Sequence, residues 1–346
     1  MTALLEPFRH WTMAGVAIVA AAAALTAFLI VLLRPWLVRY AMARPNARSS
    51  HTTPTPQGGG IAVIAAFIVV STAGLLATGT APAEMVPALG TVFVATALIA
   101  ALGGLDDVRP VAVIPRLVLQ ILVVGLVIAS LPPGFQMTPF LPWWIERALL
   151  VLGGVWFVNL TNFMDGLDWM TVAEFVPLTA GLILLGAYGA LPHYAVVCAL
   201  ALLGALIGFA PFNRPVARLF LGDVGSLPLG LLGGWLLALL ADKGHLAAAL
   251  LLPLYYLMDA TVTLVRRLAR GEQVWQAHRT HFYQRATDNG FSVRQIVARV
   301  FCVNIVLVGL AVLCVRINTP AVEIAALIVG AVIVSWLLMR FSRKQA

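Results

Sequence analysis

The chain has 346 residues, of which 61% are hydrophobic and 10% are charged, with a net charge of +8. Globular domains average about 45 to 50% apolar and about 25% charged residues, so a soluble core cannot hide this many apolar side chains. The composition excludes an ordinary soluble domain and predicts an all-α polytopic membrane protein, in which a basic excess indicates loop orientation rather than a nucleic-acid partner.

Runs of about twenty apolar residues, the length that crosses a bilayer, predict about eleven transmembrane helices in a single domain covering residues 1–346. The spans lie near 12–33, 60–78, 86–104, 113–131, 144–160, 172–190, 194–210, 226–241, 245–265, 297–315 and 320–340. The first is expected to be a retained helix rather than a signal peptide. For the short spans near 144–160 and 226–241, a re-entrant segment is an alternative.

Lys and Arg are distributed unevenly between the two sides of this arrangement. Eighteen of the 22 lie in the C-terminal tail or in connections that follow the first, third, seventh and ninth spans. The positive-inside rule places that side in the cytoplasm, with the N-terminus outside and the C-terminus inside. The expected cytoplasmic loops lie near 34–59, 105–116, 161–171, 211–225 and 266–296.

Common nucleotide and redox motifs are absent from the sequence. It has neither a G-x-x-x-x-G-K-[ST] loop nor a G-x-G-x-x-G fingerprint, which argues against the usual ATP-driven and dinucleotide-binding proteins. Cys198, Cys302 and Cys314 lie in apolar stretches without a C-x-x-C pair. Buried thiols are therefore expected, rather than disulfides or metal ligands.

The first two cytoplasmic loops carry glycines and a pair of carboxylates. In RPNARSSHTTPTPQGGG (44–60), backbone amides at the start of a helix favour an anion, although a turn with close glycine packing is the alternative. In GGLDDVRPVAVIPR (103–116), Asp106 and Asp107 stand together near Arg116. Two adjacent carboxylates repel each other, and a divalent cation between them or a raised pKa of one of them would relieve this repulsion. The alternative is that the two aspartates simply end a helix and are neutralised by arginine.

The third loop reads NLTNFMDGLDWMT, residues 159–171. Asn162, Asp165 and Asp168 recur at every third position, a spacing that suits grouped oxygen ligands or acceptors for a polar substrate. Helix capping, with Thr171 opening the next helix, would explain the same residues.

The fourth loop ends in LFLGDVGSLPLG, residues 219–230, where one carboxylate interrupts apolar chain. The glycines would let a ligand approach the backbone, Ser226 would cap the next helix, and Asp223 would tolerate a phosphate only with Mg²⁺ between them. Phe220 would stack on a base or else face the membrane.

The ninth connection is long and basic. His278 and His281 are three residues apart, as on one helix face, and without nearby Cys or several acids they suit phosphate or sugar hydrogen bonding better than zinc. A loop that binds lipid headgroups is the alternative. Asp259, inside the ninth span, is either a scaffold residue paired with Arg266 and Arg267 or a buried functional acid.

Together, the motifs PNARSSHTTPTPQGGG, GGLDD, NFMDGLD, FLGDVGS and AHRTHFYQR resemble those of the polyprenyl-phosphate N-acetylhexosamine-1-phosphate transferases of glycosyltransferase family 4. The likeness spans residues 44–285. The related muramoyl-pentapeptide branch has three consecutive aspartates and three consecutive histidines, whereas here Leu105 precedes two aspartates, and Arg279 and Thr280 separate the histidines. The sequence is therefore more similar to enzymes that initiate O-antigen or related surface polysaccharides.

The resemblance implies a reaction. Undecaprenyl phosphate attacks the β-phosphorus of a UDP-N-acetylhexosamine, giving UMP and undecaprenyl-pyrophosphate-sugar, with Mg²⁺ as cofactor and Mn²⁺ as a substitute. It also implies a multi-pass protein of the bacterial inner membrane whose active site faces the cytoplasm. A nucleotide-sugar or lipid-phosphate transporter is the alternative function, and the oligomeric state is open, with a homodimer among the options.

The resemblance also implies residue roles. Asp106 and Asp107 would form the catalytic acidic pair, and Asp223 with Asn162 would hold the metal. A phosphate monoester is largely anionic near neutral pH, so positioning should outweigh base catalysis. The expected substrate-binding residues are Asp165, Asp168, Phe220, Arg116, His278, Arg279 and His281.

Overall fold

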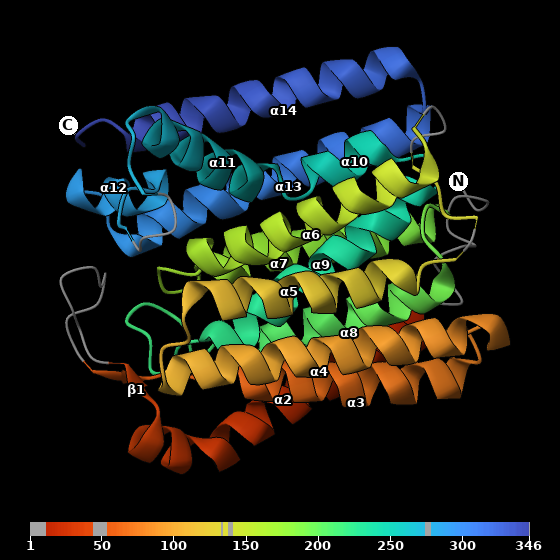
Figure 1. Cartoon of the computed structure of the whole chain (residues 1–346), viewed down its shortest axis with the longest axis horizontal. Helices are drawn as coiled ribbons and strands as arrows, with labels where there is room; N and C mark the ends of the chain where they lie inside the picture. Colours follow the sequence, from red (N-terminus) through yellow and green to blue (C-terminus); the bar gives the residue numbers. More distant parts are fainter. Residues whose placement is uncertain (1–11, 44–53, 133, 138–140, 274–277, 346) are drawn as a thin grey trace.

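A computed structural model of the chain describes residues 12–43, 54–132, 134–137, 141–273 and 278–345. Its helices run side by side along one direction, and their connections gather at two ends (Figure 1). The short strand β1 (Met42–Ala43), the short helix α12 (Phe282–Asp288) and the C-terminus lie at one of these ends. Loops that are distant in sequence are therefore close together in space.

The helices account for nearly all of the regular structure among the described residues. They are α2 (Thr12–Tyr40), α3 (Gly60–Thr78), α4 (Val86–Val108), α5 (Val113–Ala129), α6 (Trp143–Met164), α7 (Met170–Ala187), α8 (His193–Phe209), α9 (Asp223–Asp242), α10 (Leu246–Leu251), α11 (Leu254–Ala269), α12 (Phe282–Asp288), α13 (Val293–Ile317) and α14 (Pro320–Phe341), with the 3-10 turn η2 (Ala83–Met85). Two short strands, β1 (Met42–Ala43) and β2 (Thr55–Pro56), pair antiparallel.

Eight of the described helices are long and apolar enough to cross a membrane, and α5 and α8 are shorter apolar helices. The chain is an all-α, multi-pass membrane protein. The two short spans for which a re-entrant segment was an alternative correspond to α6 and α9, with 22 and 20 residues. The ninth predicted span is instead divided between α10 and α11 at Pro253, whose nitrogen cannot donate a helical hydrogen bond.

Helix boundaries also differ from the predicted loops. The first helix continues to Tyr40, α11 continues to Ala269, and α9 begins at Asp223. The short helix α12 occupies part of the predicted loop 266–296. Helical hydrogen bonding thus extends past the apolar runs because a helix can continue beyond the hydrocarbon region.

Helix α9 lies at the centre of the bundle and contacts α3, α4, α6, α7, α8 and α10. Glycines allow this close packing: a Cβ on Gly60 of α3 would lie 2.2 Å from Cα of Gly225, and a Cβ on Gly103 of α4 would lie 2.2 Å from the carbonyl oxygen of Asp223. Small residues are typical where membrane helices pack backbone to backbone. The polar first turn of α9 is therefore fixed against α3 and α4.

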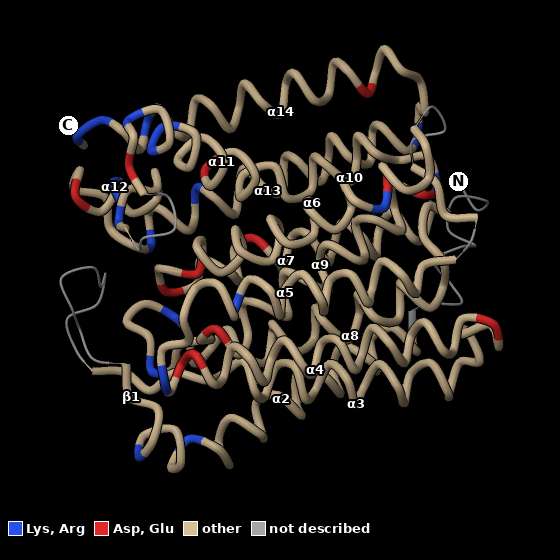
Figure 2. The backbone as a smooth tube through the Cα atoms, in the orientation of Figure 1, with Lys and Arg blue, Asp and Glu red and all other residues tan. Residues whose placement is uncertain are grey.

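Lys and Arg gather at the end that carries β1, α12 and the C-terminus, where several carboxylates also lie (Figure 2). This distribution agrees with the uneven charge of the loops in the sequence. That this end faces the cytoplasm stays a prediction of the positive-inside rule.

Candidate active site

Asp107, at the end of α4, caps the first turn of α9. Its two carboxylate oxygens accept hydrogen bonds from the backbone N–H groups of Asp223 and Val224, at 2.9 and 3.1 Å. These amides have no partner within the helix, and the helix dipole favours a negative charge there. Gly222 precedes them with φ of +78°, and a Cβ on it would lie 2.5 Å from Asp107. The predicted cap Ser226 does not fill this role.

Asp106 points in another direction and holds the loop after α4. One oxygen accepts the backbone N–H of Val111 at 2.7 Å, and the other pairs with Arg116 at 2.6 Å. The same Arg116 nitrogen lies 3.9 Å from the Asp223 carboxylate. Arg116 therefore connects Asp106 with Asp223, whereas no ion pair joins it to Asp107. Of the helix-end pair Asp106 and Asp107, only Asp106 is satisfied by arginine.

Asn162, on the last turns of α6, joins the same cluster. Its side-chain nitrogen donates to the Asp223 carboxylate at 2.7 Å and to the Ser226 hydroxyl at 2.9 Å. Asp223 thus receives contacts from Asp107 of α4, Arg116 of α5 and Asn162 of α6. We call Asp106, Asp107, Asn162, Asp165 and Asp223 the acidic corner.

Asp165 directly follows α6 and accepts a short hydrogen bond from the Thr171 hydroxyl. Burial raises the pKa of Asp165 to about 8; the Thr171 bond opposes this shift, and the charges of Asp223 and Asp107 add to it. The alternative in which Thr171 opens the next helix is wrong, because Trp169 occupies the N-cap of α7. The acidic corner thus brings several carboxyl groups close together.

Asp168 lies nearby but holds a different segment. Its carboxylate accepts the backbone N–H of Ala217 at 2.9 Å, in the turn between α8 and α9. Asn213 braces the same turn: its side chain accepts from the backbone N–H of Trp169 and donates to the carbonyl of Leu219. Both contacts fix the segment that leads into Phe220 and Asp223.

The described part of the first loop, from residue 54, packs directly against this segment. Gly59 and Gly60 donate their backbone N–H groups to the carbonyls of Phe220 and Leu221, and Phe220 donates to the carbonyl of Pro56. The expectation of amides available to an anion is wrong for these two glycines, and the alternative of close glycine packing is confirmed. Residues 44–53 of the motif lie outside the described residues.

The side chain of Phe220 is partly buried, between the backbone contacts with Pro56 and Gly59. Phe220 stands three residues before Asp223 in the chain. Its stacking on a base stays a prediction.

The histidine loop, residues 278–281, precedes α12 rather than lying on a helix, so the expected helical face is wrong. The rings of His278 and His281 nevertheless stack, with centroids 4.8 Å apart. Burial, with His281 and Arg267 nearby, lowers the pKa of His278 to about 4. Its imidazole is therefore neutral near pH 7.

Asp259 of α11 is fully buried and organises this loop. Its oxygens accept the backbone N–H groups of Phe282 and Tyr283 at 3.0 and 3.1 Å, and one lies 3.3 Å from Nδ1 of His281. The expected pairing of Asp259 with Arg266 and Arg267 is wrong: Arg267 pairs with Glu272 at 2.8 Å. Asp259 instead fixes the imidazole of His281.

Arg279 points away along α12, where it pairs with Asp288 at 3.0 Å and donates to the hydroxyl of Thr287 at 2.8 Å. The histidine loop and α12 both reach Phe163: the ring of His281 lies 6.3 Å from the Phe163 ring, centroid to centroid, and the Tyr283 hydroxyl donates to the carbonyl of Phe163 at 2.8 Å. Phe163 follows Asn162 directly. The two regions therefore meet at the end of α6.

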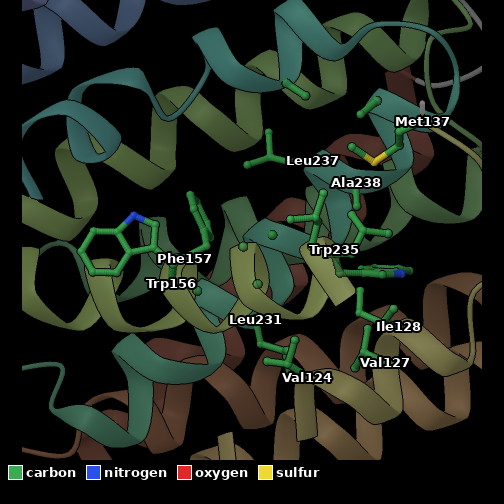
Figure 3. A pocket seen from close by; sticks show the side chains of 18 of the residues that line it. Val124, Val127, Ile128, Met137, Trp156, Phe157, Leu231, Trp235, Leu237 and Ala238 are labelled. Atoms are coloured by element: carbon green, nitrogen blue, oxygen red, sulfur yellow. The ribbon is translucent and has the colours of Figure 1, made fainter. Parts of the chain in front are cut away.

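An apolar pocket of about 280 Å³ begins farther along the same helices, with Val124 and Val127 of α5, Trp156 and Phe157 of α6 and Leu231 of α9 among its walls (Figure 3). Gly230, which also lines it, stands seven residues after Asp223, or about 10 Å along α9. The pocket extends from there towards the opposite end of the bundle.

Known proteins share this sequence pattern. Residues 89–241 match the family described as glycosyl transferase family 4. The decaprenyl-phosphate N-acetylglucosaminephosphotransferase of Mycobacterium leprae is 28% identical over 330 residues, covering 84% of this chain and 81% of the relative. The probable undecaprenyl-phosphate N-acetylglucosaminyl 1-phosphate transferase of Bacillus subtilis is 27% identical, covering 77% and 75%. Residues 89–241 of the chain therefore belong to glycosyl transferase family 4.

A third relative, the phospho-N-acetylmuramoyl-pentapeptide-transferase of Limosilactobacillus fermentum, is 37% identical, but over only 28% of this chain and 31% of its own length. The likeness to that branch is therefore local. The N-acetylglucosamine-phosphate transferases match along most of both chains.

Sequence reasoning missed one residue of this site, Asn213, and one contact, that of Asp259 with His281. It did not consider Asn213, whose only signal is an asparagine after α8 beside aromatic residues. It noted Asp259, but not its contact with His281. An acid in an apolar helix needs partners. The basic residues nearest to Asp259 in sequence are Arg266 and Arg267, but its partners are His281 and the backbone amides of α12.

Proposed function

We propose that this protein transfers an N-acetylhexosamine-1-phosphate from a UDP-sugar to undecaprenyl phosphate. The products are UMP and undecaprenyl-pyrophosphate-sugar, and the reaction would initiate a cell-surface polysaccharide such as O-antigen. The observation that carries the proposal is the convergence of Asp107, Asn162 and Arg116 on Asp223 at the basic end of a family 4 bundle. The basic end would face the cytoplasm, where UDP-sugars occur.

The donor groups of the acidic corner fit Mg²⁺. Carboxylate and amide oxygens are hard ligands, and Mg²⁺ usually binds through one or two carboxylates plus substrate phosphates rather than in a protein cage. Among the described residues, no group of three His, Cys, Asp or Glu side chains is arranged as a metal site. Asp223 would hold the ion, with the side-chain oxygen of Asn162 beside it, and the bound ion would neutralise phosphate charge.

Asp106 and Asp107 would act mainly by positioning. Both oxygens of Asp107 are bonded to the first amides of α9, and both oxygens of Asp106 are bonded to Val111 and Arg116. These bonds fix Asp223 relative to Arg116, whose guanidinium would bind a phosphate oxygen. A lipid phosphate needs little deprotonation near neutral pH, so correct placement is the main requirement.

The remaining predicted residues would bind the donor substrate. Phe220 would stack on the uracil, and Asp165 and Asp168 would accept hydrogen bonds on the nucleotide side. His278 and His281 would lie near the pyrophosphate or sugar, and Arg279 would reach them only by leaving Asp288. The matches to N-acetylglucosamine-phosphate transferases, which cover most of both chains, favour UDP-N-acetylglucosamine over a muramoyl-pentapeptide donor.

The apolar pocket supports a polyprenyl acceptor. Its walls are almost entirely apolar, and it begins about two helical turns from Asp223 along α9. A lipid whose phosphate lies at the acidic corner could direct its first isoprene units along this pocket. A soluble acceptor would have no apolar chain to bury in this pocket.

The test is UMP release by the purified protein from UDP-N-acetylglucosamine, with undecaprenyl phosphate and Mg²⁺. Asp223→Asn should lower the rate by about 100-fold or more, the loss typical when one electrostatic group of an active site is removed. Asp242→Asn is the matched control, because Asp242 ends the same helix at its opposite end and should leave the rate unchanged. Full activity of Asp223→Asn would refute the metal role, and sugar uptake into vesicles without UMP release would favour the transporter.

A further inference from the structure

A separate cavity of about 440 Å³ lies at the basic end, between α11, α12 and the last turns of α14. Three arginines line it, one from each wall: Arg266 from α11, Arg285 from α12 and Arg343 just after α14. None of its described lining residues is acidic. Three positive groups around one cavity repel each other unless an anion binds between them.

The acidic side chains near this cavity bind partners other than its three arginines. Among the described residues, Glu272 pairs with Arg267 and Arg270, Asp288 pairs with Arg279, and Asp259 holds the histidine loop. Arg266 stacks on the ring of Phe282, with 4.7 Å between the guanidinium and the ring centroid, which orients it without neutralising it. The charge of the cavity is therefore uncompensated by the part of the protein that the structure describes.

The other half of the lining is apolar and continuous with the outer surface of the bundle. Met258 and Val262 of α11 face Leu338 and Met339 of α14 across the cavity, and Met339 is 54% exposed. A ligand that fits must carry a negative head and an apolar body. A free phosphate or nucleotide would satisfy only the arginines.

Helix α11 separates this cavity from the histidine loop. Residues 258, 262 and 266 follow one face of α11 at four-residue intervals, whereas Asp259, Thr263 and Arg267 follow the adjacent face towards His281. Phe282 and Arg285 belong to α12, whose first amides Asp259 holds. The cavity thus shares its walls with the supports of the histidine loop, but not with the acidic corner.

We propose that this cavity binds the phosphate headgroup of an anionic glycerophospholipid from the adjacent leaflet, with the acyl chains along α11 and α14. Basic pockets between membrane helices at the cytoplasmic side are suited to anionic headgroups. The site is additional to the proposed reaction, because the lipid is neither donor nor acceptor.

Titration of phosphatidylglycerol onto the purified full chain in neutral detergent, followed by native mass spectrometry, tests the proposal. The double variant Arg285→Gln, Arg343→Gln should bind phosphatidylglycerol about 25-fold more weakly, or about fivefold for each arginine removed. Arg270→Gln is the control: it removes one charge at the same end without changing the cavity, and it should bind as the wild type does. Arg285→Lys should retain most of the affinity.

Three competitors identify the ligand. Phosphatidylcholine and inorganic phosphate should displace phosphatidylglycerol only weakly, and undecaprenyl phosphate should not displace it at concentrations that saturate catalysis. Unchanged affinity of the double variant for phosphatidylglycerol would overturn the proposal. Strong displacement of phosphatidylglycerol by inorganic phosphate, or its displacement by undecaprenyl phosphate, would overturn it as well. UMP release by the double variant in detergent reports on the transferase separately, so failure of this site and failure of the proposed reaction are distinguishable.

Discussion

The acidic corner and the histidine loop lie at the same end of the bundle but are held by different means. In the acidic corner, helices meet backbone to backbone through Gly60, Gly103 and Gly225, and Asp107 binds the exposed amides of α9. In the histidine loop, one buried side chain, Asp259, collects two amides and an imidazole. In the acidic corner the packed backbones cannot shift to accept a larger residue, whereas the histidine loop depends on the single carboxylate of Asp259.

Among the variants that test this comparison, Asp107→Asn should have the largest effect, although Asp107 would not hold the metal. An amide offers one acceptor where the carboxylate offers two, and its NH₂ group would face the α9 amides. Displacement of Asp223 should lower UMP release by about 100-fold, the cost of a misplacement near 1 Å. Glu84→Gln, at the start of the same helical segment, should leave UMP release unchanged. If Asp107→Asn retained more than half of the wild-type rate, the positioning role would be wrong.

Gly103→Ala tests the packed backbone directly. Its Cβ would collide with the carbonyl of Asp223, so the free energy of unfolding should fall by about 1 to 3 kcal/mol, the usual cost of overpacking. Gly90→Ala on the same helix meets nothing within 4 Å and is the matched control. Thermal unfolding of both variants in detergent measures the difference. Equal unfolding temperatures would show that α4 and α9 can separate slightly at no cost.

Asp259→Asn tests the histidine loop. Loss of one acceptor for the amides of α12 and for His281 should lower kcat about tenfold, since an unsatisfied buried group costs about 1 to 3 kcal/mol. Glu272→Gln removes an ion pair from the same region without touching His281, and it should keep the wild-type kcat. A wild-type kcat in Asp259→Asn would exclude Asp259 as a positioning residue for the reaction.

The smallest effect concerns pH. His278 has a pKa of about 4 in the folded protein, compared with 6.5 as its ordinary value. As pH falls from 6.5 to 4 the unfolded chain takes up the proton first, so this group makes the fold less stable on acidification. The unfolding temperature should therefore drop less between pH 6.5 and 4.5 in His278→Gln than in the wild type. His193→Gln, an exposed imidazole on α8, should show the wild-type drop.

Apolar run length predicted where nearly every helix lies, because a membrane span must satisfy its own backbone hydrogen bonds. The break at Pro253 was not predicted, since proline is often tolerated inside membrane helices, as Pro228 of α9 illustrates. The residues of the acidic corner were found from their charge in apolar surroundings. The bond between Asp107 and the backbone of Asp223 was not predicted, because it joins positions 116 residues apart, and periodicity carries no information over that distance.

The same limit explains the errors in the loops. The two histidines have helical spacing, but Asp259 draws the amides of α12 so that the helix begins only after His281. The glycines of residues 58–60 were suited to an anion by type, yet the carbonyls of Phe220 and Leu221 occupy two of their amides. Local sequence indicates which groups can bond, and tertiary structure decides which of them remain available.

The central position of α9 bears on how the chain is built during translation. Most of its neighbours, from α3 to α8, precede it in the sequence, so they can already be in the bilayer when α9 leaves the ribosome. At about 5 to 20 residues per second, roughly ten seconds separate the synthesis of Asp107 from that of Asp223. Until then the carboxylate has no helix to cap, and a nascent chain interrupted before residue 223 would carry its acidic pair without the group that completes the site.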